Sequence, residues 1–439
     1  MPELYQIPSD QEFTPELILS LIRRFEGNEL TRFNLLRDYY NGRHSILYRK
    51  FTDPLKPNKK IISPYPNYVV EVMTGFFMGS PVKYSSENER YMAYIQDVLD
   101  ANHDQSHNMR LARDMSIYGM AYELIYLNDK AEVKYSHVAP DTAFLIHDDS
   151  IEKNVLAGIR FYGTHDYLTE KKNMVVELYT KDERLVYVKG EDADSIELIE
   201  SAPNRFRDIP LLQYKNNDFM TGDFENVIPL IDGYDESISD TANDQAYFVD
   251  KYMVIKGMTA TETQDVAKLK EDRILIVGEN GDVEFLVAES DHSGLELHKN
   301  RLNDSIHKFC MIPDMSADKL GNELSGKAIQ YKFTMTENLA ITKERSFKES
   351  LQKRLQLITR ILNIRTGRGE SSYDALDIAL TFTRNLPADA EEMVTMAKNL
   401  QGLTSTQTAL EALPSTIVDD AKYEQDRIDK EGPKAPPLV

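Results

Sequence analysis

The sequence predicts an α+β protein whose helical and strand-rich parts are segregated along the chain. Three observations support this prediction: helical periodicity up to about residue 113, short strand-like runs between about residues 121 and 216, and long helical patterns after residue 222. Turn residues, and not helical crossovers, separate many of the strand-like runs. This spacing favours antiparallel hairpins over a parallel sheet.

The first helical part begins at Thr14-Pro15-Glu16, where Thr suits the N-cap and Pro suits the first helical position. Apolar residues then recur at helical spacing, which predicts one buried helix face. Three further helices are predicted by the same criterion, around Phe33–Tyr40, Tyr68–Phe77 and Tyr91–Leu99.

The strand-rich part consists of short runs, several of which alternate apolar and polar residues with period two. We predict the strands Tyr122–Leu127, Val133–Val138, Ala143–His147, Val155–Tyr162, Val175–Tyr179, Arg184–Val188, Ile196–Ile199 and Leu211–Tyr214.

Two long helices are predicted near residues 226–256 and 293–311, with Pro229 in the first turn of the first. The second carries an apolar face of Leu295, Leu302, Ile306 and Phe309. The insert between them holds a predicted hairpin, in which Arg273–Val277 and Val283–Val287 flank the turn Gly278-Glu279-Asn280-Gly281. Such a helix pair can return antiparallel and project its insert away from the body.

The longest helix is predicted from about Ser325 to Ile364, a length of about 60 Å at 1.5 Å per residue. A short strand, Ile378–Phe382, follows it, and residues 431–439 are rich in proline and predicted to be disordered. The clearest apolar seam of the long helix is Phe347, Leu351, Leu355, Ile358 and Leu362.

The formal net charge of −21 argues against a broad DNA-gripping surface, because phosphate contacts require basic residues. No apolar run approaches the length of a membrane span, so we predict no membrane partner. Cys310 is the only cysteine, which excludes an intrachain disulfide and a cysteine-based zinc site and favours a reducing compartment such as a cytoplasm.

A near-match to a nucleotide-binding P-loop precedes the longest helix. Gly321, Gly326 and Lys327 fit the pattern, but Ala328 stands where a magnesium-binding hydroxyl belongs. The preceding residues are polar and contain a proline, so no buried strand leads into the loop. A flexible loop followed by a helix capped at Ser325 explains the same residues more simply. A nucleotide-driven ATPase remains the alternative.

Other candidate groups favour structural roles. His103 and His107 stand four apart, but no third metal ligand is evident and polar cap or loop roles are favoured. Asp141 and Asp148-Asp149 fit solvated loop acids, and Cys310 fits a small packing residue. We therefore predict no catalytic residue, no metal site and no cofactor, and a protein that is not an enzyme.

Motifs spread over nearly the whole chain carry a family resemblance. They are Tyr39-Tyr40-Asn41-Gly42 with His44 and Ile46, Lys59-Lys60-Ile61, Pro64-Tyr65, Gly75 to Val82, Ser116 to Glu123, Ala157 to Tyr162, Gly222-Asp223-Phe224-Glu225, Leu230 to Tyr234, Ser325 to Ala328, Phe382 to Pro387 and Leu403 to Thr408. In this order they make the chain similar to the portal proteins of tailed double-stranded DNA bacteriophages, of the type found in phages of Gram-positive bacteria.

The resemblance implies a ring, usually of twelve subunits, at one capsid vertex in the virion, assembled in the host cytoplasm. It implies a portal fold with an α/β wing, two stem helices, a small α/β clip, a long kinked tunnel helix and a helical crown. The corresponding ranges are 1–217 for the wing, 218–256 and 293–312 for the stem helices, 257–292 for the clip, 313–324 for the tunnel loop, 325–387 for the long helix and strand, and 388–430 for the crown.

The resemblance also implies partners and site residues. The partners are double-stranded DNA in the channel, the terminase large subunit, head-completion and adaptor proteins, and capsid and scaffolding proteins. The tunnel loop would present Ser316, Asp318, Lys319, Gly321, Asn322 and Glu323 to DNA, with Lys319 the foremost contact. Lys299, Arg301 and Lys308 would line the stem, and Glu279, Asn280 and Asp282 would dock partners at the clip. The alternative for each is a solvated or inter-subunit surface residue.

Overall fold

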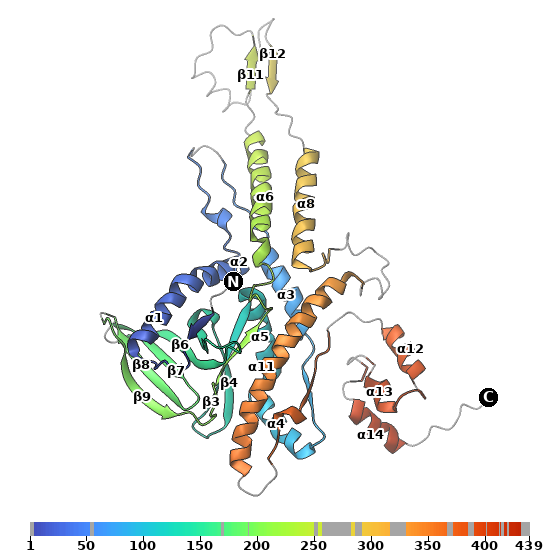
Figure 1. Ribbon diagram of the computed structural model, residues 1–439. Helices are drawn as coiled ribbons and strands as arrows, with labels where there is room; N and C mark the ends of the chain where they lie inside the picture. Colours follow the sequence, from blue (N-terminus) through green and yellow to red (C-terminus); the bar gives the residue numbers. More distant parts are fainter. Residues whose placement is uncertain are drawn as a thin grey trace, which may run out of the picture.

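The computed structural model describes residues 4–52, 57–167, 171–191, 193–249, 253–256, 282–285, 292–316, 331–366, 372–384, 390–400, 402–411, 413, 417–418 and 421–431. Within them the chain combines helices and two main sheets, which confirms the predicted α+β class. A pair of long helices rises from a mixed body, and three short C-terminal helices lie to one side of it (Figure 1).

The N-terminal helices form where the periodicity predicts them. Thr14 caps the first helix, since its hydroxyl oxygen accepts the backbone N–H of Leu17 at 3.3 Å. A π-helical turn, Glu26–Leu30, leads from the first helix into the second. The helices are α1 (Pro15–Phe25), α2 (Thr31–Tyr40), α3 (Tyr65–Met78), α4 (Glu89–Ala101) and α5 (Asp104–Tyr118).

The strand-rich part forms two sheets with the orders β1-β5-β6-β7-β8-β9 and β10-β3-β4. Their strands are β1 (Tyr5–Ile7), β3 (Met120–Leu127), β4 (Val133–Val138), β5 (Ala143–Asp148), β6 (Val155–Asp166), β7 (Lys171–Tyr179), β8 (Glu183–Gly190), β9 (Glu197–Pro203) and β10 (Leu211–Lys215).

The predicted antiparallel pairing is confirmed for every pair except one. Strand β1 pairs parallel with β5, with Tyr5 opposite Ile146. Three residues carry too little alternation to be recognised as a strand, and their partner lies far along the chain. Local sequence patterns therefore did not predict β1.

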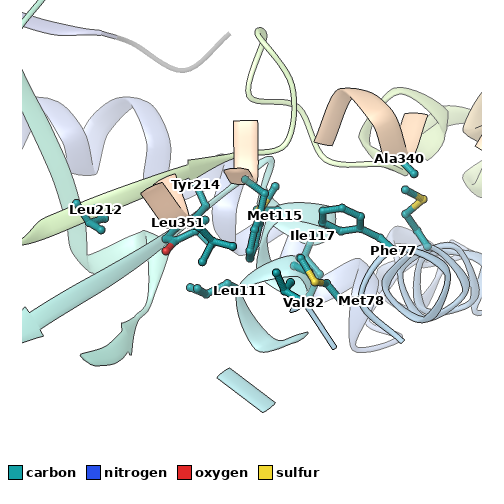
Figure 2. Packing of buried hydrophobic residues seen from close by; sticks show 14 of the residues in the cluster. Phe77, Met78, Val82, Leu111, Met115, Ile117, Leu212, Tyr214, Ala340 and Leu351 are labelled. Atoms are coloured by element: carbon teal, nitrogen blue, oxygen red, sulfur yellow. The ribbon is translucent and has the colours of Figure 1, made fainter. Parts of the chain in front are cut away.

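Two apolar clusters hold the body together. One packs α1 against the six-stranded sheet, where the rings of Phe25 and Phe144 stack at 4.9 Å. The other joins α3, α5 and the three-stranded sheet to the long helix α11 (Thr334–Thr366). Figure 2 shows residues of this second cluster, among them Phe77, Met115, Tyr214 and Leu351.

Helix α11 carries the predicted seam. Phe347, Leu351 and Leu355 are fully buried, Ile358 is nearly so, and Leu362 is partly buried. Residues 331 and 332 are helical and a turn at Phe333 separates them from α11, while the predicted start at Ser325 lies outside the described residues. The predicted strand near 378–382 is β13 (Ala379–Thr381), which pairs with β2 (Lys83–Ser85).

The projecting pair consists of α6 (Ile228–Val249) and α8 (His292–Cys310), which lie side by side with the strands β11 (Met253–Lys256) and β12 (Asp282–Phe285) beyond their far ends (Figure 1). The prediction that the first helix continues to residue 256 is wrong. Its described part reaches Val249, and Met253–Lys256 form β11, where the β-branched run Val254-Ile255 favours a strand.

One further prediction for the pair falls outside the described residues, and one is wrong. Within the described part, β12 pairs with β11, with Val254 opposite Glu284, and the predicted partner strand 273–277 lies outside the described residues. Phe309 is 60% exposed and does not share the apolar face of α8, because the neighbouring Cys310 occupies the buried position.

Helices α12 (Ala390–Leu400), α13 (Thr406–Glu411) and α14 (Ala421–Glu431) are the last helices in the described part of the chain. Short 3₁₀ turns occur at Ser45–Tyr48, Pro140–Thr142, Glu225–Val227 and Ala375–Asp377. In the described part of the chain, none of the helices combines the length and the apolar character that crossing a lipid bilayer requires.

Candidate functional site in the projecting helix pair

Helix α6 is strongly acidic. Its sequence contains no Lys or Arg and carries five acidic residues, Asp232, Asp235, Glu236, Asp240 and Asp244. Glu236, Asp240 and Asp244 are exposed, whereas Asp235 is fully buried. The exposed acids recur every four residues, so they form one stripe along the helix.

A second stripe of α6 is polar and buried, and it binds an extended chain segment. Asp235 Oδ1 accepts the backbone N–H of Ser63 at 2.7 Å, the Ser239 hydroxyl accepts that of Ile61 at 2.9 Å, and Asn243 Oδ1 accepts that of Lys59 at 2.6 Å. We call residues 43–52 and 57–63 the strap.

The spacing of these bonds has a geometric reason. Four residues of helix rise about 6 Å, and two residues of extended chain rise about 6.6 Å. Side chains at every fourth position of α6 can therefore reach every second N–H of the strap. Asp235, Ser239 and Asn243 are all buried, so these bonds replace water that the site excludes.

The base of the strap is fixed by a buried histidine. His44 Nδ1 lies 2.5 Å from Asp235 Oδ2, His44 Nε2 lies 3.1 Å from the carbonyl oxygen of Tyr39, and the two rings stack at 4.7 Å. The Tyr39 hydroxyl donates to Asp232 at 2.6 Å, and burial together with this bond raises the pKa of Tyr39. Arg49 Nη1 donates to Asp240 at 2.7 Å.

We call residues 216–227, which link β10 to α6, the joint. Side chains of three helices, α11, α5 and α2, bind it. The Lys343 ammonium of α11 donates to both carboxylate oxygens of Asp223, at 2.7 and 2.9 Å, and to Asn216 Oδ1. Lys343 is fully buried, and this burial lowers its pKa, although Asp223 opposes the effect. Ser116 of α5 donates its hydroxyl to Asp223 as well.

Helix α2 contacts the same joint through Arg32. Its guanidinium donates to Glu225 Oε1 and Oε2 at 2.7 and 2.6 Å and to the backbone carbonyl of Met220 at 2.9 Å. Gly222 lies against the end of α5, where an added Cβ would stand 2.3 Å from the carbonyl oxygen of Ile117. The joint therefore fixes the direction in which α6 leaves the body.

Strap and joint residues were not predicted as functional, although many belong to the motifs behind the resemblance. A signal for the strap was present, since Asp235, Ser239 and Asn243 form a polar stripe inside an otherwise apolar helix pattern. The joint gave no such signal, because Lys343 and its partner Asp223 are 120 residues apart and no local pattern contains both.

The predicted stem residues do not share one face of α8. Arg301 and Lys308 are exposed and border one shallow groove, together with Asp304. Lys299 does not border this groove and pairs with Glu296 on its own helix.

Most of the predicted tunnel-loop and clip residues lie outside the described residues. Ser316 is described and exposed, and its N–H donates to Asp314 Oδ1 at 2.9 Å. Asp282 is the first residue of β12, opposite Lys256. Those outside the described part are Asp318, Lys319, Gly321, Asn322, Glu323, Glu279 and Asn280.

The near-match to a P-loop also lies outside the described residues. The segment that leads towards it, residues 311–316, is turn and coil. A P-loop follows a buried strand, so the described geometry lacks the context that the motif needs.

The other candidate residues have separate partners. His103 is the N-cap residue of α5, and His107 Nε2 lies 2.9 Å from Glu123 Oε1. Asp141 accepts from Arg37 at 2.8 Å, and Asp148 accepts from Ser150 and Asn154. Cys310 is buried as predicted, and burial raises the pKa of its thiol to about 12.

Comparison with known proteins identifies the class. A family model described as "Phage portal protein, SPP1 Gp6-like" matches residues 22–436. The chain therefore belongs to the SPP1 Gp6-like family of phage portal proteins, which confirms the predicted resemblance.

Two curated relatives agree with this assignment. The portal protein of Bacillus phage SPP1 is 23% identical over 436 residues, which cover 96% of this chain and 84% of the relative. The portal protein of Clostridium phage phiCD119 is 21% identical over 415 residues, which cover 88% of this chain and 89% of the relative. Portal function and a place in the virion follow from the family.

Proposed function

We propose that copies of this chain form a ring, of twelve subunits in the virion, whose axial channel passes double-stranded DNA during packaging and ejection. The observation that carries this proposal is the projecting pair α6–α8, which leaves the body through a fixed joint (Figure 1). Arranged around an axis, such pairs form the wall of a stem.

Exposed apolar side chains near the pair support assembly into a ring. Leu297 and Phe309 of α8 are 64% and 60% exposed, and Tyr331 and Met335 are 80% and 62% exposed. Large exposed apolar groups that recur in one region mark protein contacts. Adjacent copies in a ring would cover them.

The acidic balance suits a channel that DNA must slide through. DNA carries one negative charge per roughly 1.7 Å of its axis, and a strongly basic wall would hold it. The net charge of −21 per copy keeps the wall acidic overall, while cations such as Arg301 and Lys308 of α8 centre the duplex.

The remaining parts take their roles from the same arrangement. The insert 257–292, with β12 at its edge, docks the terminase large subunit and later the head-completion and adaptor proteins through Glu279, Asn280 and Asp282. The loop 313–324 faces DNA, and the body 1–217 with helices 388–430 meets capsid and scaffolding proteins. The chain performs no chemistry, and a separate terminase hydrolyses ATP.

A charge reversal in the loop tests the DNA-facing role. Lys319→Glu should leave ring formation intact and reduce DNA packaged per particle by about tenfold or more, because the reversed residue repels phosphate. The matched variant Lys319→Arg keeps the charge and should package normally. Unchanged packaging by Lys319→Glu would show that Lys319 does not face DNA. If the isolated chain hydrolysed ATP, and Lys327→Ala abolished this activity, the proposal that the chain performs no chemistry would be wrong.

A further inference from the structure

The strap exposes an unusual surface for this acidic protein. The continuous segment 43–63 contains six basic residues and one acidic residue, Asp53, in a chain of net charge −21. Lys50 and Lys59 are exposed, and Tyr48 beside them is 68% exposed. Phe51 and Ile61 are also more than one third exposed.

This surface is held in one conformation. Three buried α6 side chains bind the backbone of one limb of the strap, and the other limb is fixed by the His44–Asp235 and Arg49–Asp240 pairs. A segment presented in a fixed conformation loses little conformational freedom on binding. Its exposed lysines and aromatic rings are therefore suited to bind a partner.

A second copy of this chain fits this surface by charge. Copies that each carry −21 repel one another, so a ring needs local contacts of opposite sign. The exposed α6 stripe offers Glu236 and Asp244 at either side of Asp240, which already binds Arg49 within one chain.

Ring symmetry brings the two surfaces to the same height. Rotation about the axis leaves the height of each residue along that axis unchanged. The N–H of Lys59 binds Asn243, and Arg49, next to Lys50, binds Asp240. Both lysines thus lie level with the acidic stripe of an adjacent copy whose helix pair runs along the axis.

We propose that Lys50 and Lys59 of each copy bind Glu236 and Asp244 of the adjacent copy and that this contact closes the ring. The inference rests on the proposed ring. It adds which surfaces meet and makes the strap an assembly element.

A mixing experiment with full-length chains tests this contact. One variant carries Lys50→Glu and Lys59→Glu, the other carries Glu236→Lys and Asp244→Lys, and native mass spectrometry with electron microscopy counts rings. Each variant alone should give less than about a tenth of the wild-type ring yield, because like charges then oppose. An equimolar mixture should restore rings of alternating chains, since every contact again joins opposite charges.

A control variant separates a local contact from added charge. Lys130→Glu with Lys181→Glu makes the same charge change at exposed loop positions of the body and should form wild-type rings. Far-UV circular dichroism checks that each chain folds. Rings from the strap variant alone, no rings from the mixture of folded variants, or equal loss in the control would each overturn the contact. Absence of wild-type rings would overturn the proposed function itself.

Discussion

The body and the projecting helix pair differ in where their charged and apolar side chains find partners. In the body, Arg354 of α11 is fully buried and donates to Glu123 at 3.0 Å and to Asp104 at 2.7 Å, within the same chain. In the pair, Arg301 and Phe309 of α8 are exposed. Arg354 thus finds its charged partners within one copy, whereas Arg301 and Phe309 of the pair stay exposed in a single copy.

Breaking the buried ion pair at the joint should have the largest effect. Lys343→Met leaves Asp223 buried without its cation, so we expect a loss of about 4 kcal/mol in the free energy of unfolding. Urea denaturation followed by circular dichroism measures it. Lys348→Met changes an exposed lysine of the same helix and should cost less than about 0.5 kcal/mol. Equal losses of unfolding free energy in the two variants would show that the Lys343–Asp223 pair does not stabilise the joint.

Acid should weaken the body through Glu123. Burial alone raises the pKa of this carboxyl, but Arg354 and hydrogen bonds from His107 and Tyr214 lower it from 4.5 to about 2. The pKa of Glu123 is lower in the folded chain than in the unfolded chain. The ionised carboxylate therefore stabilises the fold above about pH 4.5, and this stabilisation is lost as pH falls towards 2.

The size of that contribution is about 3 kcal/mol, from 1.4 kcal/mol per pKa unit. Urea denaturation between pH 6 and pH 3 should show wild-type stability falling more steeply than that of Glu123→Gln, which has no carboxyl at this position. Parallel pH curves for the two chains would show that Glu123 does not carry the acid sensitivity.

Changes to exposed apolar residues of the pair should have the smallest effect on a single copy. Leu297→Ser with Phe309→Ser should change the unfolding free energy of the monomer by less than about 0.5 kcal/mol. Ring yield should nevertheless fall, because the ring would cover these residues. Native mass spectrometry and urea denaturation of the same sample separate the effects. If this double variant lost monomer stability but formed normal rings, Leu297 and Phe309 would stabilise the single copy and not the contacts between copies.

Periodic patterns predicted much of the fold because they report local burial. The seam of α11 and most antiparallel strands followed from spacing alone. Spacing did not predict contacts between segments distant in sequence, such as the parallel pairing of β1 with β5. Lys343 and Arg354 have the residue type of a solvated face, and only the folded chain shows their buried carboxylate partners.

The same limit applies to the candidate site. Sequence and resemblance indicated a projecting helix pair, but residues 253–256, predicted to end the first helix, form the strand β11. The strap bonds join residues about 180 positions apart, so no local pattern contains them. Lys59 belongs to one motif of the family resemblance, and Lys50 belongs to none.

The most direct test of a channel-forming portal is electron microscopy of the purified full-length chain under assembly conditions, viewed down the ring axis. We predict a closed cyclic ring with a central hole walled by the α6–α8 pairs, and with the exposed apolar residues of α8 and the strap at contacts between copies. Only monomers or dimers, both in solution and at the capsid vertex, would contradict the account.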